Sequence, residues 1–238
     1  MTDPQATLQE LVTSNRIVAR EEVVDAFGHV SLRDPTNPER YFLSRSLSPA
    51  LVTEADLMEF RLDGEPLDQR DRRMYAERAI HGALYEARPD VNAVVHNHSL
   101  AVIPFGATNT PIRPIYHMAT GIGQNVPIWD IRDNFGETNL LVVTMDQGRD
   151  LAKAVGDGRV ALMRGHGCVV AGPSLREAVI VSIYLQINAK LQMDAMRMGE
   201  VTYLSETEEK LYGEIQFSPL ALDRSWGYYR ARADLAGV

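Results

Sequence analysis

Residues 77–99 read ERAIHGALYEARPDVNAVVHNHS and contain the patterns that indicate how the chain folds. Apolar residues at helical spacing, among them Ile80 and Leu84, predict a helix over 71–88 that ends before Pro89. A short β-prone run over 92–95 then leads into two histidines separated by one residue. The stretch therefore predicts a helix followed by a strand that ends in a histidine pair.

The pair His96 and His98 is a candidate metal site. Side chains at positions i and i+2 of an extended strand point to the same face, so both imidazoles project together and Asn97 projects away. Two imidazoles on a rigid strand edge suit a cation such as Zn²⁺ or Mn²⁺. An HxH pattern is equally compatible with two ordinary surface or core histidines, so the pair alone does not decide between these interpretations.

The motif RGHG at 164–167 adds a third histidine, His166, at the end of the apolar run 160–163. The flanking glycines permit backbone conformations and close approaches that other residues avoid. A plain turn that contains a histidine is the competing interpretation. Three histidine ligands would leave positions open on the metal, which is typical of catalytic sites and not of structural ones.

Glu77 is the candidate acid/base residue. It lies on the helix that precedes the histidine pair, and His81 follows one helical turn later on the same side. A carboxylate near a cation can ligate it, or act as a general acid and base once substrate displaces it. Because the segment DRRMYAER (71–78) is heavily charged, a solvated helix face is the competing interpretation, and spacing alone favours that one.

The rest of the sequence mixes strand and helix patterns without regular alternation. Strands are predicted over 27–33, 40–44, 140–144 and 160–163, and a hairpin where 60–62 precedes DGEPL. Helices are predicted over 8–17, from Thr53, over 148–155, from a Ser174/Glu177 capping box to near Gly199, and from Glu206 onward. We therefore expect one domain over residues 1–238, an α/β sandwich with a mainly antiparallel central sheet.

The composition argues against several classes of partner. The chain has 24 Lys and Arg against 32 Asp and Glu, a formal net charge of −8, and no long basic run of the kind that nucleic acid requires. The same acidity disfavours anionic membranes, and no apolar run approaches the roughly 20 residues of a membrane helix. We expect no signal peptide. Cys168 is the only cysteine, which fits the cytoplasm as the expected location.

Together, the glutamate, RPD (88–90), HxH and GHG resemble the class II aldolase/adducin family over roughly residues 8–200. That family includes sugar-phosphate aldolases and epimerases, adducin head domains and a decarboxylase branch. The resemblance implies a three-layer α/β/α sandwich, assembled as a homotetramer with sites near subunit interfaces. It assigns the metal to His96, His98 and His166 and the acid/base role to Glu77. Because all four are present, the chain resembles the catalytic members more than an adducin-like interaction module.

The positions that bind phosphate in the sugar-phosphate members are different here. Their GN-x-S loop corresponds to GHVS at 28–31, and their Thr-Gly-type loop corresponds to SRSL at 44–47. Met74 and Tyr75 replace the serine pair before the glutamate. Most of the small hydroxyl and glycine groups expected around a phosphate are missing. The pattern resembles the decarboxylase branch, whose members act on hydroxylated aromatic or pyridine dicarboxylates or on ring-cleavage acids.

We therefore expect a pocket that binds a carboxylate. Arg45 brings a planar cation that can hold a carboxylate through two hydrogen bonds, although it can also be read as a surface arginine. His117 is a second candidate catalytic residue beside Glu77. The further candidate substrate contacts are Ser31, Ser44, Tyr116, Arg132 and Tyr229, the last reaching a site from the C-terminal tail or from a neighbouring subunit.

These residues predict a carbon–carbon lyase with one divalent metal ion, Zn²⁺ or Mn²⁺ first and Fe²⁺ or Co²⁺ as further options. The favoured reaction is decarboxylation of a hydroxylated aromatic (di)carboxylate or an oxo/enol ring-cleavage acid in aromatic catabolism, through a metal-stabilised enolate. An aldolase acting on a hydroxy-oxo acid or a sugar phosphate needs the same enolate and is the first alternative. A non-catalytic, adducin-like interaction module is the second.

Overall fold

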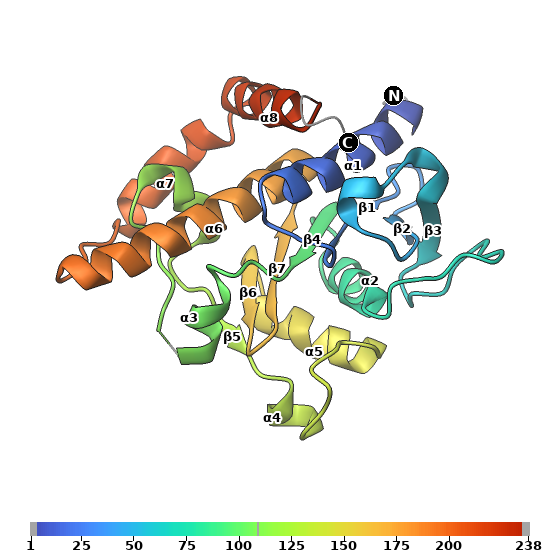
Figure 1. The fold of residues 1–238 in the computed structure, drawn as a ribbon, viewed down its shortest axis with the longest axis horizontal. Helices are drawn as coiled ribbons and strands as arrows, with labels where there is room; N and C mark the ends of the chain where they lie inside the picture. The colour runs from blue at the N-terminus through green and yellow to red at the C-terminus, as the bar shows by residue number, and fades with distance from the viewer. Residues whose placement is uncertain (1–3, 109, 235–238) are drawn as a thin grey trace.

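The computed structural model describes residues 4–108 and 110–234 (Figure 1). Its centre is a seven-stranded sheet with the strand order β3-β2-β1-β4-β7-β6-β5. The strands are β1 His29–Arg33, β2 Arg40–Ser44, β3 Leu57–Arg61, β4 Ala93–Asn97, β5 Ile128–Trp129, β6 Val160–Met163 and β7 Gly167–Gly172. Every pairing is antiparallel except that of β5 with β6, so the prediction of a mainly antiparallel central sheet is confirmed.

Helices cover both faces of this sheet and complete the predicted three-layer α/β/α sandwich. The α-helices are α1 Pro4–Arg20, α2 Arg78–Ala87, α3 Ile103–Thr108, α4 Arg132–Phe135, α5 Met145–Val155, α6 Leu175–Met198, α7 Glu206–Gln216 and α8 Pro219–Asp234. Three short 3-10 helices are η1 Pro49–Leu51, η2 Glu54–Asp56 and η3 His117–Ile122. The helices α2 and α5 lie on one side of the sheet, and α1, α6 and α8 lie on the other (Figure 1). No helix among the described residues is both long and apolar enough to cross a membrane.

The alternation of side chains along β1 and β4 decides which groups face α2. Val30 of β1 and Val95 of β4 belong to the core beneath α1 and α6. His29, Ser31 and His96 have the opposite parity, so they face α2. The ladder pairs His29 directly with His96. The first predicted metal ligand therefore lies on the α2 side of the sheet, beside a second histidine.

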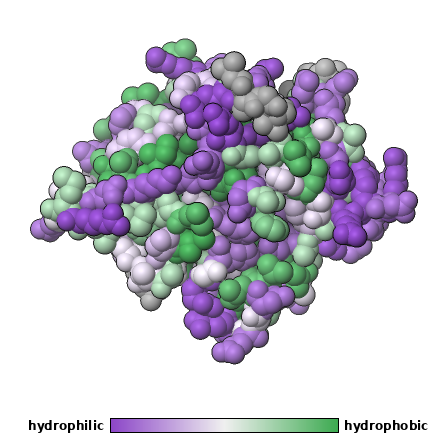
Figure 2. All heavy atoms as spheres, in the orientation of Figure 1, coloured by the Kyte–Doolittle hydropathy of each residue, from purple (hydrophilic) through white to green (hydrophobic). Residues whose placement is uncertain are grey.

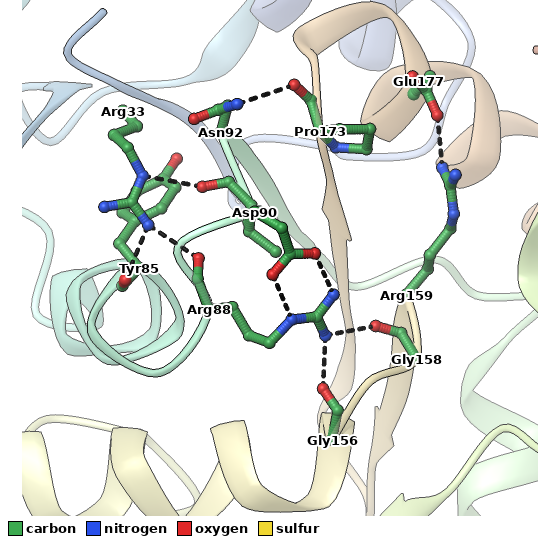
Figure 3. Close-up of polar contacts among 11 residues, drawn as sticks. Arg33, Tyr85, Arg88, Asp90, Asn92, Gly156, Gly158, Arg159, Pro173 and Glu177 are labelled. Carbon is green, nitrogen blue, oxygen red and sulfur yellow. Dashed lines mark hydrogen bonds and ion pairs between the residues drawn. The ribbon is translucent and has the colours of Figure 1, made fainter. Parts of the chain in front are cut away.

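The RPD motif holds the end of α2 against the turn between α5 and β6. The guanidinium of Arg88 pairs with both carboxylate oxygens of Asp90, at 2.8 and 2.6 Å. It also donates to the carbonyl oxygens of Gly156 and Gly158 (Figure 3). Because one planar side chain binds a carboxylate and two carbonyls at once, Arg88 fixes this corner of the fold.

Arg33 of β1 closes the same corner from the other side (Figure 3). It donates to the carbonyl oxygens of Tyr85 and Arg88, at 2.7 and 2.9 Å, and to that of Val91 at 2.9 Å. The last carbonyls of a helix have no partner within the helix, so an arginine that binds them stabilises the helix end. The end of α2 is thereby joined to the central strands.

The predicted start of α2 at residue 71 is wrong, since the helix begins at Arg78. The preceding segment binds the loop after β2 and the first residue of β3, and its own backbone forms only a turn between Gln69 and Arg72. The carbonyl of Arg73 accepts from the Ser46 amide at 2.8 Å, and Arg72 donates to the Leu57 carbonyl at 3.0 Å. As a result Glu77 is the N-cap residue of α2. Its side chain does not lie on the charged, solvated helix face that the spacing over 71–78 favoured.

The predicted strand over 140–144 is also wrong, because these residues form an irregular segment before α5. Leu140 has a φ of 69°, in the left-handed region that interrupts a strand. At the start of α6, Ser174 caps the backbone amide of Glu177 as predicted, but the Glu177 carboxylate pairs with Arg159 at 2.8 Å. The other predicted strands and helices appear near their expected positions, and β5 was not predicted.

Replacing Arg88 with lysine should lower the free energy of unfolding by about 1.5–3 kcal/mol, because an ammonium group cannot keep the carboxylate pair and both carbonyl bonds. Arg149→Lys is the matched control, since Arg149 pairs with Glu86 from an exposed position on α5, and exposed pairs stabilise little. Urea unfolding measures both variants. Equal midpoints for the two would contradict the role given to Arg88.

Candidate metal centre

Three histidines and one glutamate meet at one point on the α2 side of the sheet. His98 Nε2 lies 3.1 Å from His96 Nε2 and 3.0 Å from His166 Nε2. The Glu77 Oε2 atom lies 3.6 Å from His96 Nε2 and 3.5 Å from His166 Nε2. Each residue offers one ligand atom within 4.8 Å of the others. The structure thus brings together the four residues on which the metal and acid/base predictions depend.

Backbone carbonyls turn two of the rings so that Nε2 faces inward. His96 Nδ1 lies 3.1 Å from the Cys168 carbonyl, and His166 Nδ1 lies 3.0 Å from the Leu140 carbonyl. Because a carbonyl only accepts, Nδ1 carries the hydrogen in both neutral rings, and Nε2 presents a lone pair to the centre.

The donor set fits a divalent metal ion. Neutral imidazole lone pairs that face one another at 3.0–3.1 Å repel unless a positive charge lies between them. Nitrogens bound at about 2.0–2.1 Å to one Zn²⁺ lie roughly 3 Å apart, as these do. His96, His98 and His166 would hold the ion, and three protein nitrogens leave positions for a small molecule.

Glu77 is held beside this centre by a backbone bond. Its Oε1 accepts from the Val142 amide at 2.9 Å, which leaves Oε2 toward the histidines. Burial raises the pKa of Glu77, but hydrogen bonds and positive charge from protonated His166 and His96 outweigh it in the metal-free site and hold the pKa well below its usual range; in the loaded site the cation would supply that positive charge. Glu77 is therefore a carboxylate at neutral pH.

The two glycines of the GHG motif allow the histidine loop to pass close to β4. Gly165 has a φ of 65°, which favours glycine. A Cβ on Gly167 would lie 2.1 Å from the Asn97 carbonyl oxygen, so a larger residue would push β7 away from β4. Both glycines thus place His166 opposite the end of β4.

A cleft of about 750 Å³ opens beside the centre. Its walls come from the segment after α1, the loop after β2 and the helix α6, and its lining includes Asp25, Ser48, His98, Leu100 and Lys190. His98 belongs to both the cleft and the metal centre. A small molecule in the cleft can therefore contact His98.

The predicted substrate contacts nearest to β1 and β2 already have partners in the chain. Ser31 Oγ, which is fully buried, lies 2.6 Å from His81 Nδ1. Ser44 Oγ lies 3.3 Å from the Tyr75 hydroxyl and is fully buried as well. Arg45 is partly exposed, and its Nε donates to Asp56 at 2.6 Å. Of these three, only Arg45 presents part of its side chain to solvent.

The remaining predicted site residues lie elsewhere in the single chain. His117 packs on Tyr212 of α7, with ring centroids 4.5 Å apart, and Tyr116 packs on Tyr184 of α6. Tyr229 is buried in α8, where it lines a cavity of about 530 Å³. Arg132 pairs with Asp130. Within the described part of the chain none of them contacts the metal centre, so their roles remain predictions that need a neighbouring subunit.

His29 was not predicted as a site residue. Its ring centroid lies 5.1 Å from that of His96 and 4.4 Å from that of Tyr75. His81 was expected on the Glu77 side, but its Nε2 lies 2.5 Å from His29 Nδ1. His29 is brought beside His96 by the pairing of β1 with β4, and a single sequence does not specify which strands pair.

Comparison with known proteins gives the family of the chain. Residues 9–193 match the family described as Class II Aldolase and Adducin N-terminal domain, so the chain belongs to that family. It is 30% identical over 253 residues to Decarboxylase tropJ of Talaromyces stipitatus, covering 97% of this chain and 95% of that protein. It is 29% identical to the 3,4-dihydroxyphthalate decarboxylase of Arthrobacter keyseri, covering 77% and 76%.

A solved structure has the same fold. The L-fuculose 1-phosphate aldolase from Glaciozyma antarctica matches with a TM-score of 0.78 and 22% identity, covering 98% of this chain and 90% of that one. This likeness supports the fold alone. Together with the decarboxylase relatives, the matches confirm the predicted decarboxylase-like branch and the prediction of a carbon–carbon lyase.

Removing one ligand should remove the metal. His98→Ala and His166→Ala should each weaken zinc binding more than about 100-fold, since even outer-shell partners commonly contribute 10–100-fold. His117→Ala is the control, because His117 packs on Tyr212 and not on the centre. A competition titration with a chromophoric chelator measures the three variants. Unchanged affinity in His98→Ala, or lost affinity in His117→Ala, would contradict this site.

Proposed function

We propose that this protein is a metal-dependent decarboxylase of a hydroxylated aromatic carboxylate or dicarboxylate, or of an oxo/enol ring-cleavage acid, in aromatic catabolism. The observation that carries the proposal is the convergence of three inward Nε2 atoms and the Glu77 carboxylate at the edge of a cleft. The decarboxylase relatives support the choice of reaction. A bound divalent cation, Zn²⁺ or Mn²⁺ first and Fe²⁺ or Co²⁺ as further options, would supply Lewis acidity that stabilises negative charge on a substrate oxygen.

Glu77 moves the proton in this proposal. Because its pKa lies below the usual range, it starts as a carboxylate and takes a proton from the substrate hydroxyl. Glu77 then delivers this proton to the carbon that carries the carboxylate, which turns the neighbouring C–O⁻ into a carbonyl. The bond from that carbon to the carboxylate breaks, CO₂ leaves without the electron pair, and the pair moves onto the carbonyl oxygen as an enolate. The enolate takes one proton from water, so atoms and charge balance.

Two cationic side chains at or near the cleft can bind an acidic substrate. Lys190 of α6 lines the cleft together with the acidic Glu22 and Asp25, and Arg45 lies on the same loop as the lining residue Ser48. Asp56 holds Arg45 through Nε, and a guanidinium has further N–H groups that can bind a carboxylate. In this proposal Arg45 holds a carboxylate of the substrate and orients the bond that breaks.

We further propose that the protein is a homotetramer with sites near the subunit interfaces. It acts on small carboxylates in the cytoplasm, and it has neither nucleic acid nor a membrane as partner. Hydrophobic residues gather between α6 and α8 on one face of the chain (Figure 2). Leu211, Leu220 and Tyr228 on α7 and α8 are largely exposed, which favours a subunit contact there. An interface near α7 and α8 would also allow His117, Tyr116 and Tyr229 to contact the site of a neighbouring subunit.

Release of CO₂ by the metal-loaded protein tests the reaction. We expect release from at least one member of a panel of 3,4-dihydroxyphthalate, other hydroxylated aromatic dicarboxylates and oxo-dienoate acids, and none after chelation. Cleavage of a hydroxy-oxo acid or a sugar phosphate to an aldehyde, without CO₂ release, would make the protein an aldolase. A purified protein with neither turnover nor bound metal would favour the adducin-like module.

Glu77→Gln should keep the metal and lose about 10²–10⁴-fold in kcat, the usual contribution of a positioned acid/base group. Glu86→Gln is the matched control on the same helix, since Glu86 pairs with Arg149 at the exposed surface. Steady-state CO₂ release and metal content are measured on both variants. Near-normal turnover in Glu77→Gln would remove Glu77 from the mechanism.

A further inference from the structure

His98 differs from the other two histidines of the centre in how it is held. Backbone carbonyls bind Nδ1 of His96 and of His166, but no hydrogen bond reaches Nδ1 of His98 within residues 4–108 and 110–234. His98 also lies one residue beyond the last ladder pair of β4, which joins Asn97 to Cys168. The position of His98 therefore depends on the backbone that follows it.

That backbone is held through Ser99, the next residue. The Ser99 amide donates to Asn97 Oδ1 at 3.1 Å, and Ser99 Oγ donates to Gln186 Oε1 at 2.7 Å. Ser99 and Gln186 are both buried, so bulk water does not compete for the second bond. Gln186 thus connects the chain immediately after His98 to α6.

The other end of the Gln186 amide holds the turn after α1. Its Nε2 donates to the Glu21 carbonyl at 3.0 Å. Glu21 follows the last residue of α1, which lies beside α6 on one side of the sheet (Figure 1). Beyond this turn, residues 22–26 form a wall of the 750 Å³ cleft. One amide therefore bonds both the wall over 22–26 and the segment that carries His98.

The orientation of this amide follows from its partners. A backbone carbonyl only accepts, so the amino group of Gln186 faces Glu21 and the oxygen faces the Ser99 hydroxyl. Gln186 itself lines the cleft, and so does Lys190 one helical turn later on the same face of α6. Gln186 thus joins three walls of the cleft, which are α6, the turn after α1 and the end of β4.

We propose that Gln186 is a positioning residue for the metal centre and the cleft. It holds His98 through Ser99, and it holds the wall over 22–26 through Glu21. The inference rests on the metal centre of the proposed function, and it applies equally to decarboxylation and to aldol cleavage because both need the same ligands. Loss of the amide would change metal affinity and the shape of the cleft together.

Two matched substitutions on α6 separate positioning from packing. Gln186→Met removes the amide and keeps both the length of the side chain and its helix propensity. Gln192→Met is the control, because Gln192 is also buried and bonds the Arg113 amide at 3.0 Å and the Pro111 carbonyl at 2.8 Å, outside the cleft lining. A purely structural role would give the same changes in both variants.

Hydrogen–deuterium exchange on the chelated protein tests the positioning without metal or turnover. In Gln186→Met we expect about tenfold faster exchange in peptides that cover 98–103 and 21–26, since a hydrogen bond that anchors both segments is lost. In Gln192→Met we expect faster exchange over 111–115 and wild-type exchange over 98–103. Unchanged exchange over 98–103 in Gln186→Met would overturn the proposal.

Zinc competition with a chromophoric chelator tests the link to the centre. Gln186→Met should bind zinc about 10–100-fold more weakly, the usual effect of losing an outer support of a metal ligand. Gln192→Met should keep the wild-type affinity. Equal losses in the two variants, or no loss in Gln186→Met, would reduce Gln186 to a packing role and overturn the proposal.

A double-variant cycle tests whether Gln186 acts through Ser99. Ser99→Ala should weaken zinc binding by a factor similar to that of Gln186→Met, and the combined variant should weaken it no further, because both changes remove the same bond. Additive losses would contradict this route. None of these measurements uses turnover. Absence of CO₂ release with these changes present would remove the proposed reaction alone, and normal turnover with unchanged exchange in Gln186→Met would remove the role of Gln186 alone.

Discussion

Two backbone carbonyls and one backbone amide hold the centre in place. The carbonyls of Cys168 and Leu140 fix which nitrogen of His96 and His166 faces inward, and the Val142 amide fixes Glu77. All three groups belong to main chain whose position is set by strand pairing or by the irregular segment before α5. The geometry of the centre therefore depends on the backbone of distant segments as much as on the four side chains themselves.

The sheet supplies the frame for this arrangement. β4 lies between β1 and β7, so His96 sits opposite His29 on one side and opposite Val169 on the other. The RPD corner fixes the end of α2, while Glu77 stands at its beginning. A displacement of the C-terminal end of α2 would therefore also shift Glu77 at its N-terminal end. The α2 layer and the sheet thus bring a helix start, a strand end and a turn to the same point.

Local pattern was sufficient to single out the three histidines that meet in the structure, but not the groups that hold them in place. His96 and His98 follow from the period of a strand, and His166 follows from the glycines beside it. The start of α2 and the strand expected over 140–144 were wrong because partners far along the chain bind those backbone groups. His29 was missed because its importance comes from the strand that pairs with it. Arg45 was predicted as a cation that binds a substrate carboxylate, and its bond to Asp56 was not predicted.

The central claim is that His96, His98 and His166 share one cation through Nε2, with the Glu77 carboxylate beside it. Anomalous scattering at the zinc edge, from crystals of the zinc-loaded protein, tests this most directly. The account predicts one strong peak per chain within bonding distance of the three Nε2 atoms, with both Nδ1 bonds to backbone carbonyls kept. A zinc peak elsewhere, or rings turned so that Nδ1 faces the centre, would contradict it.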